Sequence, residues 1–257
     1  MKRRRFFSLR SLWQTISLIV VNSYFLAPWG KYIPVPVFNC YSCPLANFAC
    51  PIGTLQHFIV LHKFPFFTLG VLFLAGILLG RFFCGWICPF GFIQDLLYKI
   101  PTKKLAIENK FATFIRWSIF IILVIIIPYI TLEPWFCKLC PAGTLEAGIP
   151  QILLHPPLRS LIGFLFGIKI LILIGFIISS IFISRPFCRF VCPLGTILSV
   201  FNKISFYHLE VKPTCPECSL CKPKCPINIE VYKDPNSPHC IRCHECFSCG
   251  QVKLKIR

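Results

Sequence analysis

The chain has 257 residues, of which 56% are hydrophobic and only 14% are charged. Soluble domains carry about 25% charged residues, so this composition, with a mean hydropathy of +0.71, argues against a soluble globular protein. The net charge is +18 and there are 17 cysteines. Long apolar runs argue against a small disulfide-stapled scaffold. Nucleic-acid binding is not expected, because the basic residues gather at the boundaries of those runs. The composition predicts a cysteine-rich integral membrane protein.

Four apolar runs approach the roughly 20 residues that a membrane-spanning helix needs. We expect Arg81, at the end of the second run, to extend toward the lipid headgroups, and Pro128 to kink the third run. The predicted fold is mainly α, with a four-transmembrane-helix bundle. The four predicted spans are Leu12–Pro28, Phe66–Phe83, Arg116–Leu132 and Leu161–Ser184.

The lysines and arginines predict the orientation of these spans. Of the 27, 22 lie in the two termini and the connection between the second and third spans, and four lie in the opposite connections. The positive-inside rule then places both termini in the cytoplasm and the chain in the inner membrane. The basic run Lys2–Arg5 precedes an apolar run without a small-residue cleavage site, so we expect a retained first helix.

The sequence contains an internal repeat. The segment Arg81–Gly91 matches Arg185–Gly195 at an offset of 104 residues, and Cys50–Gln56 matches Cys140–Glu146 at an offset of 90. Each half is expected to contain two spans, an outer Cys-Pro turn and an inner C-x₃-C-P turn, with a pseudo-twofold axis along the membrane normal. The predicted units are a first membrane half (1–110), a second membrane half (111–205) and a cytoplasmic tail (206–257).

The tail carries two cysteine runs that predict a small 2[4Fe–4S] ferredoxin-like domain. In the first run the x₂, x₂ and x₃ gaps, with Pro226 after the last cysteine, are typical of ferredoxins; zinc is the weaker alternative. The second run has a shorter last gap and ends in Gly250. By the crossed ligation of two-cluster ferredoxins, one cube is expected on Cys215, Cys218, Cys221 and Cys249, and the other on Cys240, Cys243, Cys246 and Cys225.

The two inner turns carry the pairs Cys84/Cys88 and Cys188/Cys192. Residues spaced i and i+4 lie on one face of a helix, and the pseudo-twofold axis would bring the two pairs together. We expect a further cubane or a thiol relay there; packing as small buried hydrophobes is the alternative.

Five cysteines lie in the predicted outer connections: Cys40, Cys43, Cys50, Cys137 and Cys140. Four of them could hold an outer cluster, with Cys43 or Cys40 left over, or they could form disulfides in an oxidising compartment. If clusters lie on both faces, a hydrocarbon core of roughly 30 Å would separate them. Quinone or another subunit would then have to carry electrons between them.

Three further residues are candidates for a quinone or proton site. Lys169 lies inside the fourth span, where an ionisable group is costly and often functional. His62 and His155 lie near the predicted starts of the second and fourth spans. Snorkelling of Lys169 and interfacial packing of each histidine are the alternatives.

From about Asn39 to Cys249 the chain resembles the NapH/NosR/CcoG-type membrane ferredoxins. The resemblance rests on the two C-x₃-C-P turns together with the cysteine run from Cys215 to Cys225 and Pro226. It implies cytoplasmic [4Fe–4S] clusters and electron exchange with membrane quinone or a partner redox subunit. The outer cysteines and the compressed last run depart from the family pattern.

The leading hypothesis is a membrane-bound iron–sulfur electron-transfer protein that passes electrons between the quinone pool or a partner redox subunit and another redox protein. No catalytic residues are assigned, since the sequence shows no Ser-His-Asp pattern or phosphate loop. One alternative is a membrane thiol–disulfide oxidoreductase that uses the outer cysteine pairs. Another is a metal-reducing or redox-regulatory assembly factor.

Overall fold

The computed structural model describes residues 9–105, 107, 109–216 and 221–256, so the predicted basic run at residues 2–5 lies outside the described residues. The fold is mainly helical, as predicted. The first half comprises α1 (Leu9–Val21), η1 (Tyr24–Leu26), α2 (Ala27–Gly30), α3 (Pro51–Val60), α4 (Phe66–Leu79), α5 (Phe82–Trp86) and α6 (Pro89–Leu97).

The second half repeats this order with more interruptions. It comprises α7 (Asn109–Ile119), η2 (Phe120–Ile126), α8 (Ile127–Thr131), α9 (Trp135–Leu139), α10 (Pro141–Gly143), η3 (Thr144–Gly148), α11 (Ile149–Leu154), η4 (Pro156–Leu161), α12 (Phe164–Phe182), α13 (Pro186–Phe190) and α14 (Pro193–Phe201). The tail contains β1 (Tyr207–Val211), η5 (Glu245–Cys249) and β2 (Val252–Ile256). The two strands pair antiparallel, with Tyr207 opposite Ile256.

Two helical stretches in the described residues are long and apolar enough to cross a membrane. They are the 21-residue stretch Phe111–Thr131, which joins α7, η2 and α8, and the 19 residues of α12. Only 22% and 11% of their most apolar windows are buried, whereas the core helix of a soluble protein is mostly buried. Their exposed apolar faces therefore suit a lipid environment.

The first and second predicted spans form shorter apolar helices than expected. Helix α1 ends at Val21, where the Asn22 side chain donates to the carbonyl oxygen of Leu18. Helix α4 ends at Gly80, whose φ of +54° is a conformation that glycine adopts without strain. These two helices have 13 and 14 residues.

The third predicted span is irregular next to Pro128, where we expected a kink. The seven residues of η2 before α8 take the wider π-helical hydrogen bonding. A proline cannot donate a backbone hydrogen bond, and a local π-helical turn is one way in which a helix absorbs that loss.

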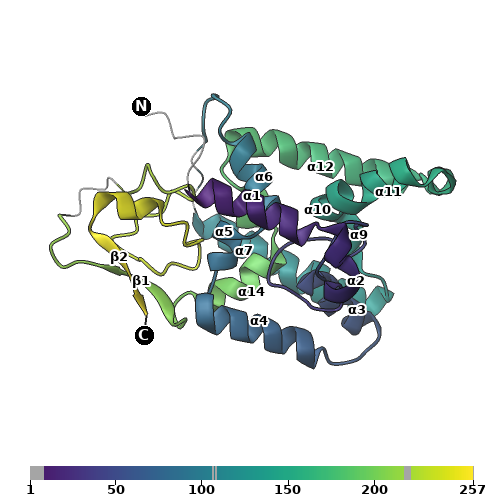
Figure 1. The fold of residues 1–257 in the computed structure, drawn as a ribbon, viewed down its shortest axis with the longest axis horizontal. Coiled ribbons are helices and arrows are strands. Elements are labelled where there is room, and N and C mark those ends of the chain that lie inside the picture. Colours follow the sequence, from purple (N-terminus) through teal and green to yellow (C-terminus); the bar gives the residue numbers. More distant parts are fainter. Residues whose placement is uncertain (1–8, 106, 108, 217–220, 257) are drawn as a thin grey trace.

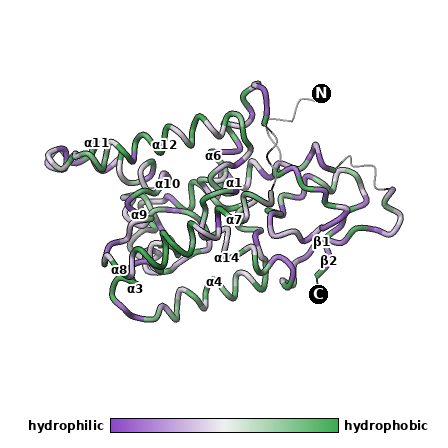
Figure 2. The backbone as a smooth tube through the Cα atoms, turned by 180° about the vertical axis from the view of Figure 1, so that it is seen from behind, coloured by the Kyte–Doolittle hydropathy of each residue, from purple (hydrophilic) through white to green (hydrophobic). Residues whose placement is uncertain are grey.

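The short helices lie toward opposite ends of the helical part. Helices α5 and α6 lie toward the tail, whereas α3, α9 and α10 lie at the far end, with α12 and α4 along the two long edges (Figure 1). Figure 2 shows that hydrophobic residues dominate α4 and α12, whereas hydrophilic residues are frequent in the tail. The two groups of cysteine turns are thus separated along the long axis.

The tail docks closely on α5 and on the end of α14. A Cβ atom on Gly85 would lie 2.3 Å from the carbonyl oxygen of Ile241, so only glycine permits this approach. The Trp86 indole donates to the carbonyl oxygen of Arg242 at 2.9 Å, and Asn202 donates to the carbonyl oxygen of Cys240 at 2.8 Å. The tail is therefore a packed part of the fold.

Candidate metal centre

Four cysteines stand immediately before a helix whose first residue is proline. In each turn the N–H of the glycine three residues later points at the sulfur; the Gly195–Cys192 distance is 3.2 Å and the Gly143–Cys140 distance is 3.5 Å. The positive end of a helix and such N–H groups stabilise a thiolate. These cysteines are Cys50 before α3, Cys88 before α6, Cys140 before α10 and Cys192 before α14.

The four inner cysteines come together beside the tail, as the repeat predicts. We name Cys84, Cys88, Cys188 and Cys192 the proximal set; all four are buried. The Cys192 sulfur lies within electrostatic range of the other three. The Gln94 side chain donates to the Cys188 sulfur at 3.4 Å and accepts from the backbone N–H of Phe187 at 3.2 Å.

Two repeat-related arginines cross between the halves at the proximal set. Arg185 donates to the carbonyl oxygen of Cys84 at 2.5 Å, and Arg81 donates to the carbonyl oxygen of Cys188 at 3.5 Å. Both side chains are buried, and Arg81 also donates to the carbonyl oxygen of Pro238 in the tail at 2.8 Å. The expectation that Arg81 extends toward the lipid headgroups is wrong. The carbonyl oxygens of Cys188 and Pro238 hold its guanidinium inside the protein.

The carboxylate of Asp95 neutralises one of these arginines. Arg185 donates to both Asp95 oxygens, from Nε at 2.7 Å and from Nη2 at 2.6 Å, and Arg10 donates to the same carboxylate. Burial acts to raise the pKa of Asp95, but the charges of Arg185 and Arg10 lower it below its usual range. This geometry fixes the Arg185 side chain against the proximal set.

Another buried arginine near the proximal set, Arg116, has no carboxylate partner among the described residues. Arg116 is fully buried within electrostatic range of Cys192 and Cys84, and its Nε and Nη1 atoms have no hydrogen-bond partner. A buried unpaired cation is costly. A [4Fe–4S] cluster with four thiolates is negatively charged, and hydrogen bonds and nearby charges tune such clusters. The residues present therefore fit a thiolate-bound cluster.

The outer cysteines form a second group of four, which we name the distal set: Cys40, Cys50, Cys137 and Cys140. The Cys140 sulfur lies within electrostatic range of Cys137, Cys50 and Cys40. Cys43 instead packs with Ala46 and Ala147 and contacts only Cys40 of the set. Cys40 and Cys43 were the two candidates for the outer cysteine outside a four-cysteine group, and these contacts identify Cys43 as that residue.

Two polar side chains hold the distal set and were not expected from the sequence. Gln56 accepts from the backbone N–H of Cys137 at 3.0 Å, and Glu146 accepts from that of Cys40 at 2.7 Å. Each belongs to the opposite half from the cysteine that it holds. Burial raises the pKa of Glu146 to about 8. The signal was present in the repeat, because Gln56, Gln94 and Glu146 each follow a Cys-Pro cysteine by six residues.

The tail cysteines are brought together only in part within the described residues. The Cys246 sulfur lies within electrostatic range of Cys243, Cys240 and Cys225, which are the four expected on one cube. In the other expected group Cys221 interacts with Cys225, Cys249 donates to the carbonyl oxygen of Cys246 at 3.0 Å, and Cys215 is half-buried. Cys218 lies outside the described residues.

The arrangement of the cysteine side chains can be compared with the two alternatives to clusters, a zinc site and disulfides. The 16 described cysteines are all free thiols. Within the described ranges, no three His, Cys, Asp or Glu side chains converge on one metal ion. A structural zinc site needs such convergence, whereas a cubane binds its thiolates at four separate iron corners.

The three predicted quinone or proton residues do not form one site. Lys169 of α12 is half-buried and within electrostatic range of Cys137. His62 is exposed and packs on the Tyr129 ring, with 4.8 Å between ring centroids. His155 is exposed and lies just after α11. Of the three, only Lys169 lies near the cysteines.

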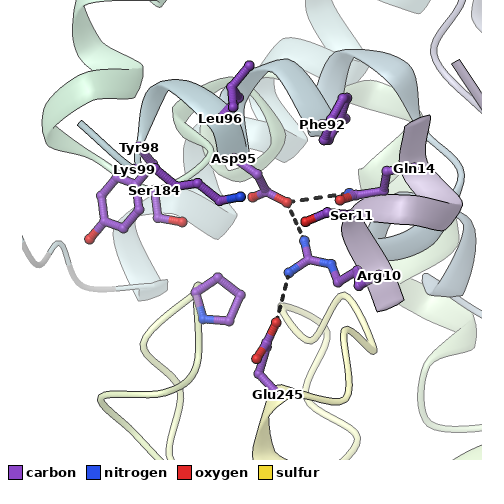
Figure 3. A pocket seen from close by; sticks show the side chains of 11 residues that line it. Arg10, Ser11, Gln14, Phe92, Asp95, Leu96, Tyr98, Lys99, Ser184 and Glu245 are labelled. Atoms are coloured by element: carbon purple, nitrogen blue, oxygen red, sulfur yellow. Dashed lines mark hydrogen bonds and ion pairs between the residues drawn. The ribbon is translucent and has the colours of Figure 1, made fainter. Parts of the chain in front are cut away.

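A cavity of about 310 Å³, lined by charged and apolar side chains, lies where α1, α6 and the tail meet. Arg10 extends across it between Asp95 and Glu245, with 3.6 Å between Arg10 Nη1 and Glu245 Oε1 (Figure 3). Pro226, which follows Cys225, also lines it. The cavity is therefore part of the junction between the helical part and the tail.

A family described as 4Fe-4S binding domain matches residues 47–66, 61–108, 113–154 and 160–208, which together are more than half of the chain. The tail from residue 209 lies outside these matches. No solved structure matches.

The relatives cover most of the chain to differing extents. An uncharacterized protein of Methanocaldococcus jannaschii is 32% identical over 85% of this chain and 90% of its own length. The ferredoxin-type protein NapH of Escherichia coli is 27% identical over 66% of this chain and 57% of NapH. The regulatory protein NosR of Stutzerimonas stutzeri is 29% identical over 71% of this chain but only 25% of NosR.

Proposed function

Because this chain belongs to the 4Fe-4S binding domain family of ferredoxin-type proteins, we propose that it is a membrane-bound iron–sulfur electron-transfer protein. It passes electrons between the quinone pool or a partner redox subunit and another redox protein. Four helices cross the membrane in the proposed arrangement, with the tail and the proximal set on the cytoplasmic side.

The proximal set carries this proposal. Four buried cysteines, two from each half, lie together beneath Arg81, Arg116 and Arg185. Arg116 lacks any carboxylate partner in the described part of the chain. When bound there, a [4Fe–4S] cluster would supply one-electron transfer and a negative charge close to the buried guanidinium of Arg116. The protein holds the sulfurs, donates N–H groups to them and excludes water.

Three further cysteine groups would hold clusters by the same chemistry. The distal set has the same Cys-Pro-x-Gly turns, and the tail groups are those expected from crossed ligation. A cluster at each group gives four in all. The half-buried Lys169, near Cys137, is the residue that we assign to quinone or proton contact at the distal end.

Metal analysis of anaerobically purified protein tests the proposal. Iron and acid-labile sulfide should each reach about 16 per chain, with EPR signals of reduced [4Fe–4S] clusters and no stoichiometric zinc. The Cys188→Ser variant should lose about four irons, because a ligand of the proximal set is removed. Zinc without sulfide or EPR signals would overturn the proposal. About eight irons, all lost with the tail cysteines, would restrict clusters to the tail.

A further inference from the structure

The connection between α2 and α3 enters the apolar core instead of remaining at the distal end. Val37 and Phe38 are only 1% and 3% exposed, respectively, although they lie in a connection that the sequence places outside the membrane. Two residues later the chain reaches Cys40 of the distal set. This path brings the distal cysteines toward the proximal ones.

Phe38 contacts the surroundings of both sets. Its backbone donates a hydrogen bond to the Cys88 sulfur of the proximal set. Its ring lies 5.2 Å from that of Phe187, the neighbour of Cys188, and 6.2 Å from that of Phe136, the neighbour of Cys137. All three rings are buried, and the Phe38 ring meets each of the other two edge-on.

These contacts limit the separation of the two sets. Each step along the backbone is about 3.8 Å, so Phe38 and Cys40 are close in space whatever the local conformation. Including the hydrogen bond, the Cys88 and Cys40 sulfurs are roughly 16 Å apart at most. That is about half of the roughly 30 Å hydrocarbon core that the sequence led us to expect between them.

We propose that the buried segment 37–40 places the distal and proximal sets close enough for an electron to pass directly between clusters bound at them. This inference rests on the proposed function. One electron is lost at the reduced set and gained at the oxidised set, and no bond breaks and no proton moves. The chain itself then carries electrons through its apolar core, without quinone or another subunit between the sets.

The same contacts continue from the proximal set to the tail. Arg81 donates to the carbonyl oxygens of both Cys188 and Pro238, and Pro238 precedes Cys240 by two residues. Arg189, the neighbour of Cys188, lies within electrostatic range of Cys225. Electrons entering at the tail would therefore meet the tail groups, the proximal set and the distal set in that order, and electrons entering at the distal end would meet them in the reverse order.

Magnetic coupling tests the spacing without any assay of activity. Two reduced clusters at this separation should broaden or split the EPR signal of each other. We expect this interaction in the dithionite-reduced wild-type protein. In the Cys50→Ser variant, which removes a distal ligand, about four irons and the distal contribution to this interaction should be lost together, while the proximal signal keeps only its coupling to the tail clusters.

The Cys43→Ser variant is the matched control, because Cys43 lies in the same connection but outside the distal set. It should keep the full iron content and the interaction. If the wild-type protein holds iron at both sets but their signals are independent in spin-relaxation measurements, the inference is overturned and the proposed function stands. If Cys50→Ser and Cys137→Ser both retain full iron, the distal set holds no cluster, which also overturns the inference.

Discussion

Arg185 donates to the carbonyl oxygen of Cys84, and this contact joins the second half of the chain to the first cysteine of the other half. The repeat-related Arg81 makes the reciprocal contact with Cys188. The halves are therefore interlocked at the proximal set, since each supplies the cation that lies over the cysteine of the other. A cluster bound here would be shared by both halves of the chain.

The contacts between the two halves predict that substitution of Asp95 lowers the stability of the protein strongly. The Asp95→Asn variant removes the charge that pairs with the fully buried Arg185, and breaking a buried ion pair costs about 3–5 kcal/mol. We expect a marked drop in the thermal unfolding temperature in detergent. The control is Glu133→Gln, which breaks an exposed pair with Lys138 and should cost about 0–1 kcal/mol. Equal effects of the two variants would contradict the assignment.

The ionised Asp95 side chain also makes the stability of the protein depend on pH in the acidic range. Although burial acts to raise its pKa, Arg185 and Arg10 lower the pKa of Asp95 below its ordinary value of 3.8. A carboxyl group with a lowered folded-state pKa stabilises fully above its unfolded-state pKa and loses this contribution as the pH falls through the folded-state value. The wild-type unfolding temperature should therefore fall more steeply below about pH 4 than that of Asp95→Asn. Parallel profiles would show that Asp95 is not the titrating group.

The local motifs were predictable because the repeat encodes them directly. Identical Cys-Pro-x-Gly turns fold alike, so the proximal set could be assembled from spacing alone. The buried position of Phe38 could not be predicted, because a connection without hydrophobic periodicity gives no indication of where it packs. Arg81 was misplaced for a related reason: from the sequence alone, an arginine buried beside the proximal set cannot be told from one at the membrane boundary.

The docking of the tail predicts an effect at Gly85. A methyl group there would meet the Ile241 carbonyl oxygen at 2.3 Å, and this backbone atom, next to Cys240, cannot move aside cheaply. Gly85→Ala should therefore displace the tail and increase its cleavage by added protease. Gly175→Ala is the control, because Gly175 lies within α12 with nothing near its Cβ position. Alanine there should be neutral or stabilise by up to about 1 kcal/mol. Unchanged protection of the tail in Gly85→Ala would contradict this packing.

The buried charge of Arg116 predicts a shift in reduction potential at the proximal set. Its guanidinium lies within electrostatic range of Cys192 and Cys84 and has no compensating carboxylate in the described residues. A nearby positive charge favours the reduced, more negative form of a bound cluster. Arg116→Met keeps an apolar stem but removes the charge, so the potential should become more negative by on the order of 60 mV, a tenfold change for one electron.

A redox titration followed by EPR measures this shift, and two further variants identify its cause. Arg116→Lys retains a positive charge and should keep most of the wild-type potential, although its shape differs from that of arginine. Arg159→Gln removes an exposed charge beyond α11 and should leave the potential unchanged, because water screens it. If Met and Lys at residue 116 lower the potential equally, hydrogen bonding or packing is responsible. The effect is assigned to charge only if the reduction potential falls in Arg116→Met and not in Arg116→Lys or Arg159→Gln.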